Sequence, residues 1–182
     1  RMETRRERPD GTPEVDMNDC LKSSLRMRPD RIIVGEVRGP EAATLLTAMN
    51  TGHDGSFGSL HANTAQETVT RMINPPMSVP PIMLTGLDLI IIQARLHVNG
   101  KTARKITEVA EIAGMEGSKP RLNTIWKYNA STDQIEETGI PSNLREVICR
   151  AAGVTPDVFE KHVNQRQQII EDLIARDITD IQ

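Results

Sequence analysis

The chain has 182 residues, with 22 basic and 25 acidic side chains and a formal net charge of −3. Hydrophobic residues make up 37 % of the sequence and aromatic residues only 2 %, so the chain is not of disordered composition and any core must be aliphatic. The net acidity and the scarcity of aromatics argue against a dedicated nucleic-acid-binding protein. No apolar run approaches the roughly 20 residues that span a bilayer. Two lone cysteines, Cys20 and Cys149, form no metal motif and fit a reducing, cytoplasmic setting.

The N-terminal segment predicts an arginine-rich strand over residues 1–7, followed by a loop. Asp16 and Asp19 have the spacing of a capping box, which predicts a helix that runs to about Met27. Because the sequence begins at Arg1, inside the expected strand, we expect the chain to be a fragment of a longer protein.

The next part of the chain predicts an α/β domain. Its pattern of apolar and polar residues predicts four elements in the order strand, helix, strand, helix. They cover residues 31–37, 40–52, 55–61 and 64–73. The first of these strands is a β-branched apolar run, which is typical of a strand buried on both faces. Such an order predicts a parallel sheet.

The remaining sequence predicts an antiparallel extension of this sheet and two terminal helices. After a short helix, three β-rich stretches are separated by hairpin signals at Asn99-Gly100 and at residues 114–120. Ser142 and Thr155 have the pattern of helix N-caps. We therefore expect a core over residues 1–135 and a helical region over residues 136–182.

Glu36 stands at the end of the first predicted strand of the α/β part. Ligands of open α/β sheets bind at the carboxyl edge of the strands, so a carboxylate there can orient and deprotonate a water that attacks a phosphate. Gly35 removes side-chain bulk beside it. The alternative is that Glu36 is a solvated residue at a strand end.

His61 ends the second predicted strand, one helix later in the sequence. Adjacent parallel strands end at the same edge, so we expect His61 near Glu36 over one crevice. A histidine there can donate to a phosphate oxygen and report whether the phosphate is present. The alternative is a histidine that is hydrogen-bonded locally.

Four segments resemble the ATPases of type II and type IV secretion and of pilus assembly. Residues 31–36 (RIIVGE) resemble the Walker B strand of that family, and residues 58–64 (GSLHANT) resemble its His box. Residues 25–30 (LRMRPD) resemble the phrase before Walker B, and residues 1–5 (RMETR) resemble an arginine-bearing segment. The likeness is strongest to the branch with tight-adherence pilus ATPases and the archaeal pilus and archaellum motors.

The resemblance implies a role for each candidate residue. Glu36 would be the catalytic glutamate that polarises the attacking water, and His61 would contact or sense the γ-phosphate. Arg1 and Arg5 would act as arginine fingers across a subunit boundary, with rate effects of roughly 10³–10⁵.

Three further residues are expected at or near the nucleotide. Arg26 and Arg28 would serve the nucleotide site or a subunit interface, and Gly35 would lie beside the bound nucleotide. For each of the four candidate arginines, the alternative is an exposed ion pair.

The resemblance further implies the C-terminal part of a RecA-like P-loop NTPase domain, using ATP and Mg²⁺. The whole protein would be a homo-hexamer, cytoplasmic and docked at the inner face of the membrane on a platform protein, with no direct membrane span and no nucleic-acid partner. The sequence contains no G-x-x-x-x-G-K-[ST] motif, so we expect this chain alone to be inactive. Two alternatives stay open: a non-catalytic scaffold or regulatory paralogue, and a conjugation-type secretion ATPase.

Overall fold

A computed structural model describes residues 1–98 and 100–178 of the chain. Internal contacts divide it into two compact units, Arg1–Pro141 and Ser142–Gln182. Strand β6 (Gln134–Glu137) belongs to the first unit and crosses position 135, where we placed the domain boundary. The division into a motor core and a helical region stays a prediction.

The α/β part of the first unit has the predicted element order. Its elements are α1 (Met17–Leu25), β1 (Ile33–Val34), α2 (Glu41–Asn50), β2 (Phe57–Gly58) and α3 (Ala65–Ile73). Strands β1 and β2 pair in parallel, with Ile33 opposite Phe57 and Val34 opposite Gly58. The mixed α/β class and the parallel pairing are therefore confirmed, and the Asp16–Asp19 capping box is present with both of its hydrogen bonds.

Strand β1 is not buried on both faces, so that expectation is wrong. Ile32 and Val34 are 6 % and 4 % exposed, whereas Ile33 between them is 63 % exposed. Successive side chains of a strand point to opposite faces. One face of β1 packs into the core, and no described element buries the face that carries Ile33.

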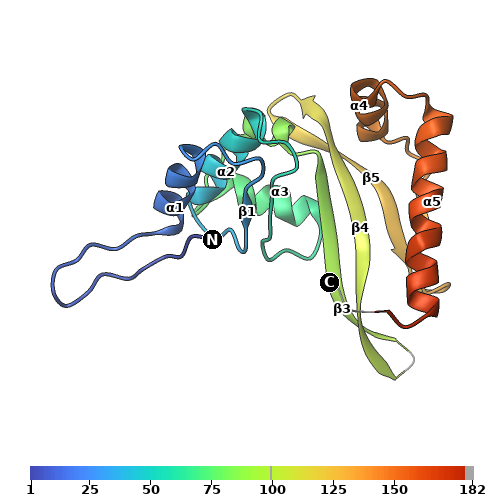
Figure 1. The fold of residues 1–182 in the computed structure, drawn as a ribbon, viewed down its shortest axis with the longest axis horizontal. Coiled ribbons are helices and arrows are strands. Elements are labelled where there is room, and N and C mark those ends of the chain that lie inside the picture. Colours follow the sequence, from blue (N-terminus) through green and yellow to red (C-terminus); the bar gives the residue numbers. More distant parts are fainter. Residues whose placement is uncertain (99, 179–182) are drawn as a thin grey trace. The chain divides into compact units, whose positions relative to one another are not determined.

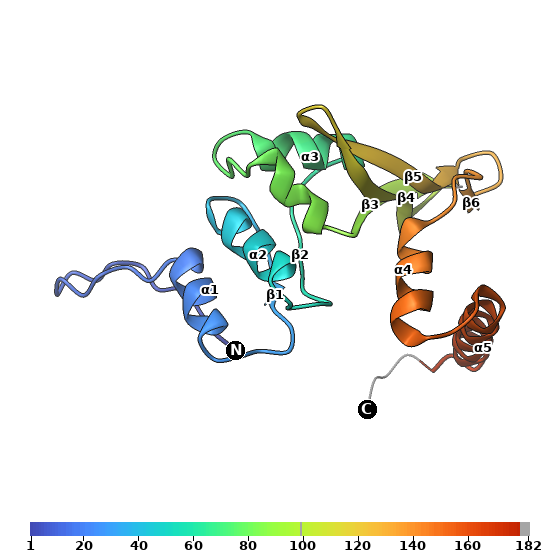
Figure 2. The same cartoon turned by 90° about the horizontal axis from the view of Figure 1, so that it is seen from above.

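The expected strand over residues 1–7 is also wrong. Arg5 makes a single antiparallel bridge with Val15, through backbone hydrogen bonds of 2.9 and 2.7 Å. The loop between them extends away from α1 in both views (Figures 1 and 2). No strand in the described part of the chain lies beside residues 1–4, so their backbone groups have no ladder to join.

The predicted antiparallel extension is a four-stranded sheet, preceded by the short helix η1 (Pro81–Gly86). The strands are β3 (Leu89–Val98), β4 (Lys101–Glu116), β5 (Lys119–Asn129) and β6, paired in the order β3-β4-β5-β6. Val98 pairs with Lys101, which confirms a tight turn between them, and Gly100 has the positive φ of +75° that such a turn requires. Asn99 lies outside the described residues.

One aliphatic core joins the two sheets of the first unit. Val34 of β1 and Leu46 of α2 belong to the same buried cluster as Ile90 and Ile92 of β3 and Ala110 of β4. Helix α3 contacts β3, β4 and β5, and Figure 1 shows it beside β3. The antiparallel sheet is thus packed directly against the part of the fold that carries Glu36 and His61.

The second unit contains α4 (Asn143–Ala152) and α5 (Pro156–Ala175), which contact each other. The Ser142 hydroxyl accepts a hydrogen bond from Arg145 N at 3.1 Å, as the N-cap pattern predicts. Gly153 ends α4 in the left-handed conformation, with φ +65°. Within residues 1–98 and 100–178, no helix combines the length and the hydropathy needed to cross a bilayer.

Candidate functional site

Glu36 and His61 lie together at one end of the parallel strand pair. The backbone ladder continues beyond β1 and β2, because Val37 N donates to Ser59 O at 2.7 Å. This register places the residues that follow the two strands side by side, and His61 Nε2 lies 3.1 Å from Glu36 Oε1. The proximity expected from the parallel sheet is present, although both assigned strands are only two residues long.

The two carboxylate oxygens of Glu36 have different surroundings. Arg38 Nη2 donates to Oε2 at 2.5 Å, and this bond is the main cause that lowers the pKa of Glu36. The charges of Arg38 and His61 act in the same direction, against partial desolvation. Oε1 is buried and has no hydrogen-bond partner among the described residues, since the 3.1 Å approach of His61 does not have hydrogen-bond geometry. An ionised carboxylate oxygen without a partner keeps its capacity to accept a hydrogen bond from any donor that reaches it.

The turn after Glu36 is held by a second glutamate, Glu41, which the sequence analysis missed. Glu41 is only 7 % exposed, and its Oε1 accepts hydrogen bonds from Arg38 N at 2.7 Å and from Gly39 N at 2.9 Å. These bonds fix the backbone that carries Arg38 toward Glu36. Arg38 was not among the predicted site residues either, although a cation two residues after Glu36 can reach back to the carboxylate.

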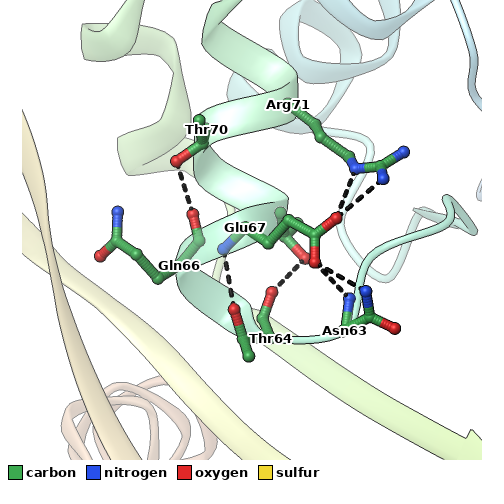
Figure 3. Close-up of polar contacts among 7 residues, drawn as sticks. Asn63, Thr64, Gln66, Glu67, Thr70 and Arg71 are labelled. Atoms are coloured by element: carbon green, nitrogen blue, oxygen red, sulfur yellow. Dashed lines mark hydrogen bonds and ion pairs between the residues drawn. The ribbon is translucent and has the colours of Figure 1, made fainter.

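The segment from His61 to α3 is fixed by a network that centres on Glu67 (Figure 3). Thr64 Oγ1 accepts Glu67 N at 3.0 Å, while Glu67 Oε2 accepts both the backbone N and Nδ2 of Asn63 at 2.9 and 3.0 Å. Thr64 and Glu67 form half of a capping box, because the Glu67 carboxylate bonds Asn63 rather than the backbone of Thr64. The hydrogen bond from the Asn63 backbone is the main cause that lowers the pKa of Glu67. The bond between Glu67 and Arg71 is the next cause.

Three hollows adjoin His61, and two of them are lined by cationic side chains. One, of about 400 Å³, is lined by Glu36, Arg38, His61 and Arg71, and the other, of about 340 Å³, by His61, Arg71 and Arg95 among others. His61 and Arg71 therefore face both hollows, and the His61 side chain is 84 % exposed. Guanidinium and imidazole groups in this arrangement can bind phosphate oxygens. Arg71 was another residue that the sequence analysis missed.

The structure does not bring Arg1 or Arg5 to Glu36 within this chain. Arg1 pairs with Glu3 at 3.1 Å, and both side chains are largely exposed. Arg5 Nη2 donates to Pro13 O at 3.1 Å, within the N-terminal arm. Neither arginine lines the hollows beside His61.

The other three candidates have local roles in the described chain. Arg26 is the C-cap residue of α1, and Arg28 has a positive φ of +54°; both side chains are exposed. Gly35 accepts a hydrogen bond from Ser59 Oγ through its carbonyl oxygen. A Cβ built on Gly35 would meet no atom within 4 Å, so crowding by the described residues does not require a glycine at this position.

The described part of the chain holds no group of three or more histidine, cysteine, aspartate or glutamate side chains arranged to bind a metal ion. The Glu36 carboxylate is already engaged by Arg38 and lies against His61. These residues do not fit a Mg²⁺ site by themselves.

The fold and the site together define an α/β protein with a carboxylate and an imidazole at the ends of two parallel strands. Residues 4–176 match the family described as type II/IV secretion system protein. This match covers nearly the whole chain, and the chain belongs to that family.

Individual relatives come from archaea and bacteria. An uncharacterized protein of Methanocaldococcus jannaschii is 33 % identical over 88 % of this chain. The conjugal transfer protein TrbB of Rhizobium radiobacter is 42 % identical over 55 % of the chain, and the type IV pilus assembly ATPase PilB of Pseudomonas aeruginosa is 43 % identical over 43 %. The matched regions are 59 %, 31 % and 14 % of these relatives' own lengths, respectively, so the chain spans only part of each of them.

Proposed function

We propose that this chain is the C-terminal part of a RecA-like ATPase domain, in a motor subunit that powers protein secretion or the assembly of a type IV pilus or archaellum. The observation that carries the proposal is the 3.1 Å approach of His61 Nε2 to Glu36 Oε1 at the edge of the parallel strands. Family membership supports the same conclusion, since one relative is named a pilus assembly ATPase.

In this proposal Glu36 is the catalytic glutamate. Arg38 keeps its carboxylate ionised by lowering its pKa, and Oε1, which is buried beside His61, accepts a hydrogen bond from the attacking water when His61 turns to the γ-phosphate. A carboxylate with a lowered pKa is a weak base, so its main contribution is to orient and polarise the water. His61 then donates to the γ-phosphate, on the side where the hollow is lined by cations.

The phosphate-binding loop and Mg²⁺ belong to other parts of the proposed domain. The sequence contains no G-x-x-x-x-G-K-[ST] motif, and the residues described do not fit a Mg²⁺ site. In the family resemblance, Walker B and the His box complete a site whose phosphate cradle comes from an upstream loop.

The candidate arginines act between subunits in this proposal. Arg1 is largely exposed, and Arg5 stands at the base of the loop that extends away from α1, so both are near surface that a neighbouring subunit could contact (Figure 1). Each would stabilise charge at the neighbour's γ-phosphate in a homo-hexamer. Arg26 and Arg28, both exposed, serve the nucleotide site or the same interface, and Gly35 lies beside it.

The cellular setting follows from the same assignment. The hexamer would be cytoplasmic and would dock on a platform protein at the inner face of the membrane. The likeness to TrbB keeps a conjugation-type secretion motor as a second candidate, which shares the chemistry and differs in cargo.

The test is ATP hydrolysis by the full-length protein, measured as phosphate release together with its oligomeric state. We expect steady turnover by a hexamer. A full-length protein that assembles but neither binds nor hydrolyses ATP would identify the non-catalytic paralogue instead.

A further inference from the structure

Glu108 of β4 contacts the start of α3, four residues after His61. Its Oε2 accepts a hydrogen bond from Ala65 N at 2.8 Å, and Ala65 is the first residue of α3. The first backbone N–H groups of a helix have no partner within the helix, and a negative charge there is favourable. Glu108 therefore supplies a partner from a distant strand to the segment that carries His61.

The neighbouring strands β3 and β5 both restrain the position of Glu108. The strand pairing shifts register between Ile92 and Gln93 on the β3 side of Glu108, and between Val109 and Ala110 on the β5 side. Such bulges re-aim side chains. The second carboxylate oxygen, Oε1, accepts Thr124 Oγ1 of β5 at 3.0 Å, so both oxygens of Glu108 are engaged.

The position of His61 depends on the backbone that follows it. Its side chain is 84 % exposed, so few neighbours restrain the ring directly. Asn63, Thr64 and Glu67 fix the turn locally, as Figure 3 shows, but these bonds all lie within residues 63–67. The Glu108 bond to Ala65 gives this turn a polar link to the antiparallel sheet, beside the apolar packing of Ala65 in the shared core.

We propose that Glu108 is a positioning residue, which holds the His61 turn against β4 and β5. The kinetic part of this inference rests on the proposed ATPase function. The structural part concerns the turn alone and can be tested without ATP.

The structural test is amide hydrogen exchange in the full-length protein. In Glu108→Ala, peptides that cover residues 62–68 should exchange faster, while peptides from β5 keep the wild-type rate. Glu136→Ala is the control, since Glu136 lies on the same sheet but bonds Asn129 and Thr132. Unchanged exchange at residues 62–68 in Glu108→Ala would overturn the proposal.

The kinetic test separates positioning from loss of fold. A displaced catalytic group can cost about 10²-fold, so we expect kcat of Glu108→Ala to fall by about tenfold to 10²-fold while the KM for ATP stays within about twofold. Glu108→Gln can still bond Ala65 N and Thr124 Oγ1 through its amide, so its kcat should recover to within about threefold of wild type. Equal losses in both variants, or a kcat of Glu108→Ala equal to wild type, would contradict positioning.

The exchange test and the kinetic test have independent outcomes. If the wild-type protein has no ATPase activity, the proposed function fails, and the exchange result still decides whether Glu108 holds the turn. If Glu108→Ala does not fold, Thr124→Val takes its place as the test variant. It removes only the hydrogen bond to Glu108 Oε1, so it should give a smaller rise in the exchange rate of residues 62–68. No rise in that variant would then count against the proposal.

Discussion

His61 Nε2 lies 3.1 Å from Glu36 Oε1, although helix α2 and two loops separate these residues in the sequence. The parallel pairing of β1 with β2 produces this contact, because it aligns the ends of the two strands. The same approach leaves Oε1 buried without a hydrogen-bond partner in the described part of the chain. Oε1 is therefore a carboxylate oxygen whose hydrogen-bonding capacity is unused in this arrangement, and the predictions below depend on this geometry.

Replacing His61 should impair the distinction between nucleotides. In His61→Ala we expect the preference for ATP over ADP to shrink while the overall nucleotide affinity changes less, because the imidazole would contact only the γ-phosphate. Titration of the full-length protein with both nucleotides measures this. His97→Ala is the matched control, since His97 contacts Thr102 on the distant hairpin. Unchanged discrimination and turnover would leave His61 with a structural role.

Arg38 should set the acid limit of activity. Its hydrogen bond and charge lower the pKa of Glu36, so removing it in Arg38→Met raises that pKa toward its usual value. Activity that needs the ionised carboxylate is present above this pKa and is lost as the pH falls through it. The acid limb of the pH–kcat profile should therefore move to higher pH in Arg38→Met, and stay in place in the control Arg121→Met. A limb that does not move would show that Glu36 ionisation does not limit turnover.

Arg5 should act on a neighbouring subunit. If it does, mixing Arg5→Ala subunits with Glu36→Gln subunits creates some interfaces in which both groups are intact, and activity partly returns. Steady-state ATPase activity across a series of mixing ratios measures the effect. Mixtures no more active than the two separate variants would argue against a shared site.

Residues 1–182 alone should bind Mg·ATP no better than about millimolar and should not hydrolyse it. Phosphate affinity in such folds comes mainly from the backbone N–H groups of a glycine-rich loop, its lysine and the helix behind it. The sequence lacks the motif for that loop. Calorimetric titration of the purified chain is the measurement, and micromolar binding would show that the site is built differently.

Much of the fold could be predicted because its signals are local. The Asp16–Asp19 capping box and the tight turn before Lys101 depend on neighbouring residues, and the structure contains both. The proximity of Glu36 and His61 could also be predicted, since it follows from two strands that run in parallel.

The remaining features depend on contacts that sequence spacing does not encode. The exposure of Ile33 depends on which elements cover each face of β1. Residues 1–7 fail to form a strand because, in the described part of the chain, only Arg5 among them has a bridge partner, Val15. Glu41 and Glu108 act through backbone N–H groups, whose positions are known only once the chain is folded. The sequence position of an acidic residue does not indicate which backbone N–H group will donate a hydrogen bond to it.

The most direct measurement is the steady-state ATPase rate of Glu36→Gln in the full-length protein, with ATP binding and oligomeric state measured on the same sample. The amide keeps the shape of the side chain but cannot polarise a water as the carboxylate does. We predict that the variant binds ATP and assembles normally while hydrolysis falls by about 10²-fold or more, and that the control Glu116→Gln keeps wild-type turnover. A Glu36→Gln rate within about twofold of wild type would contradict the assignment of this site.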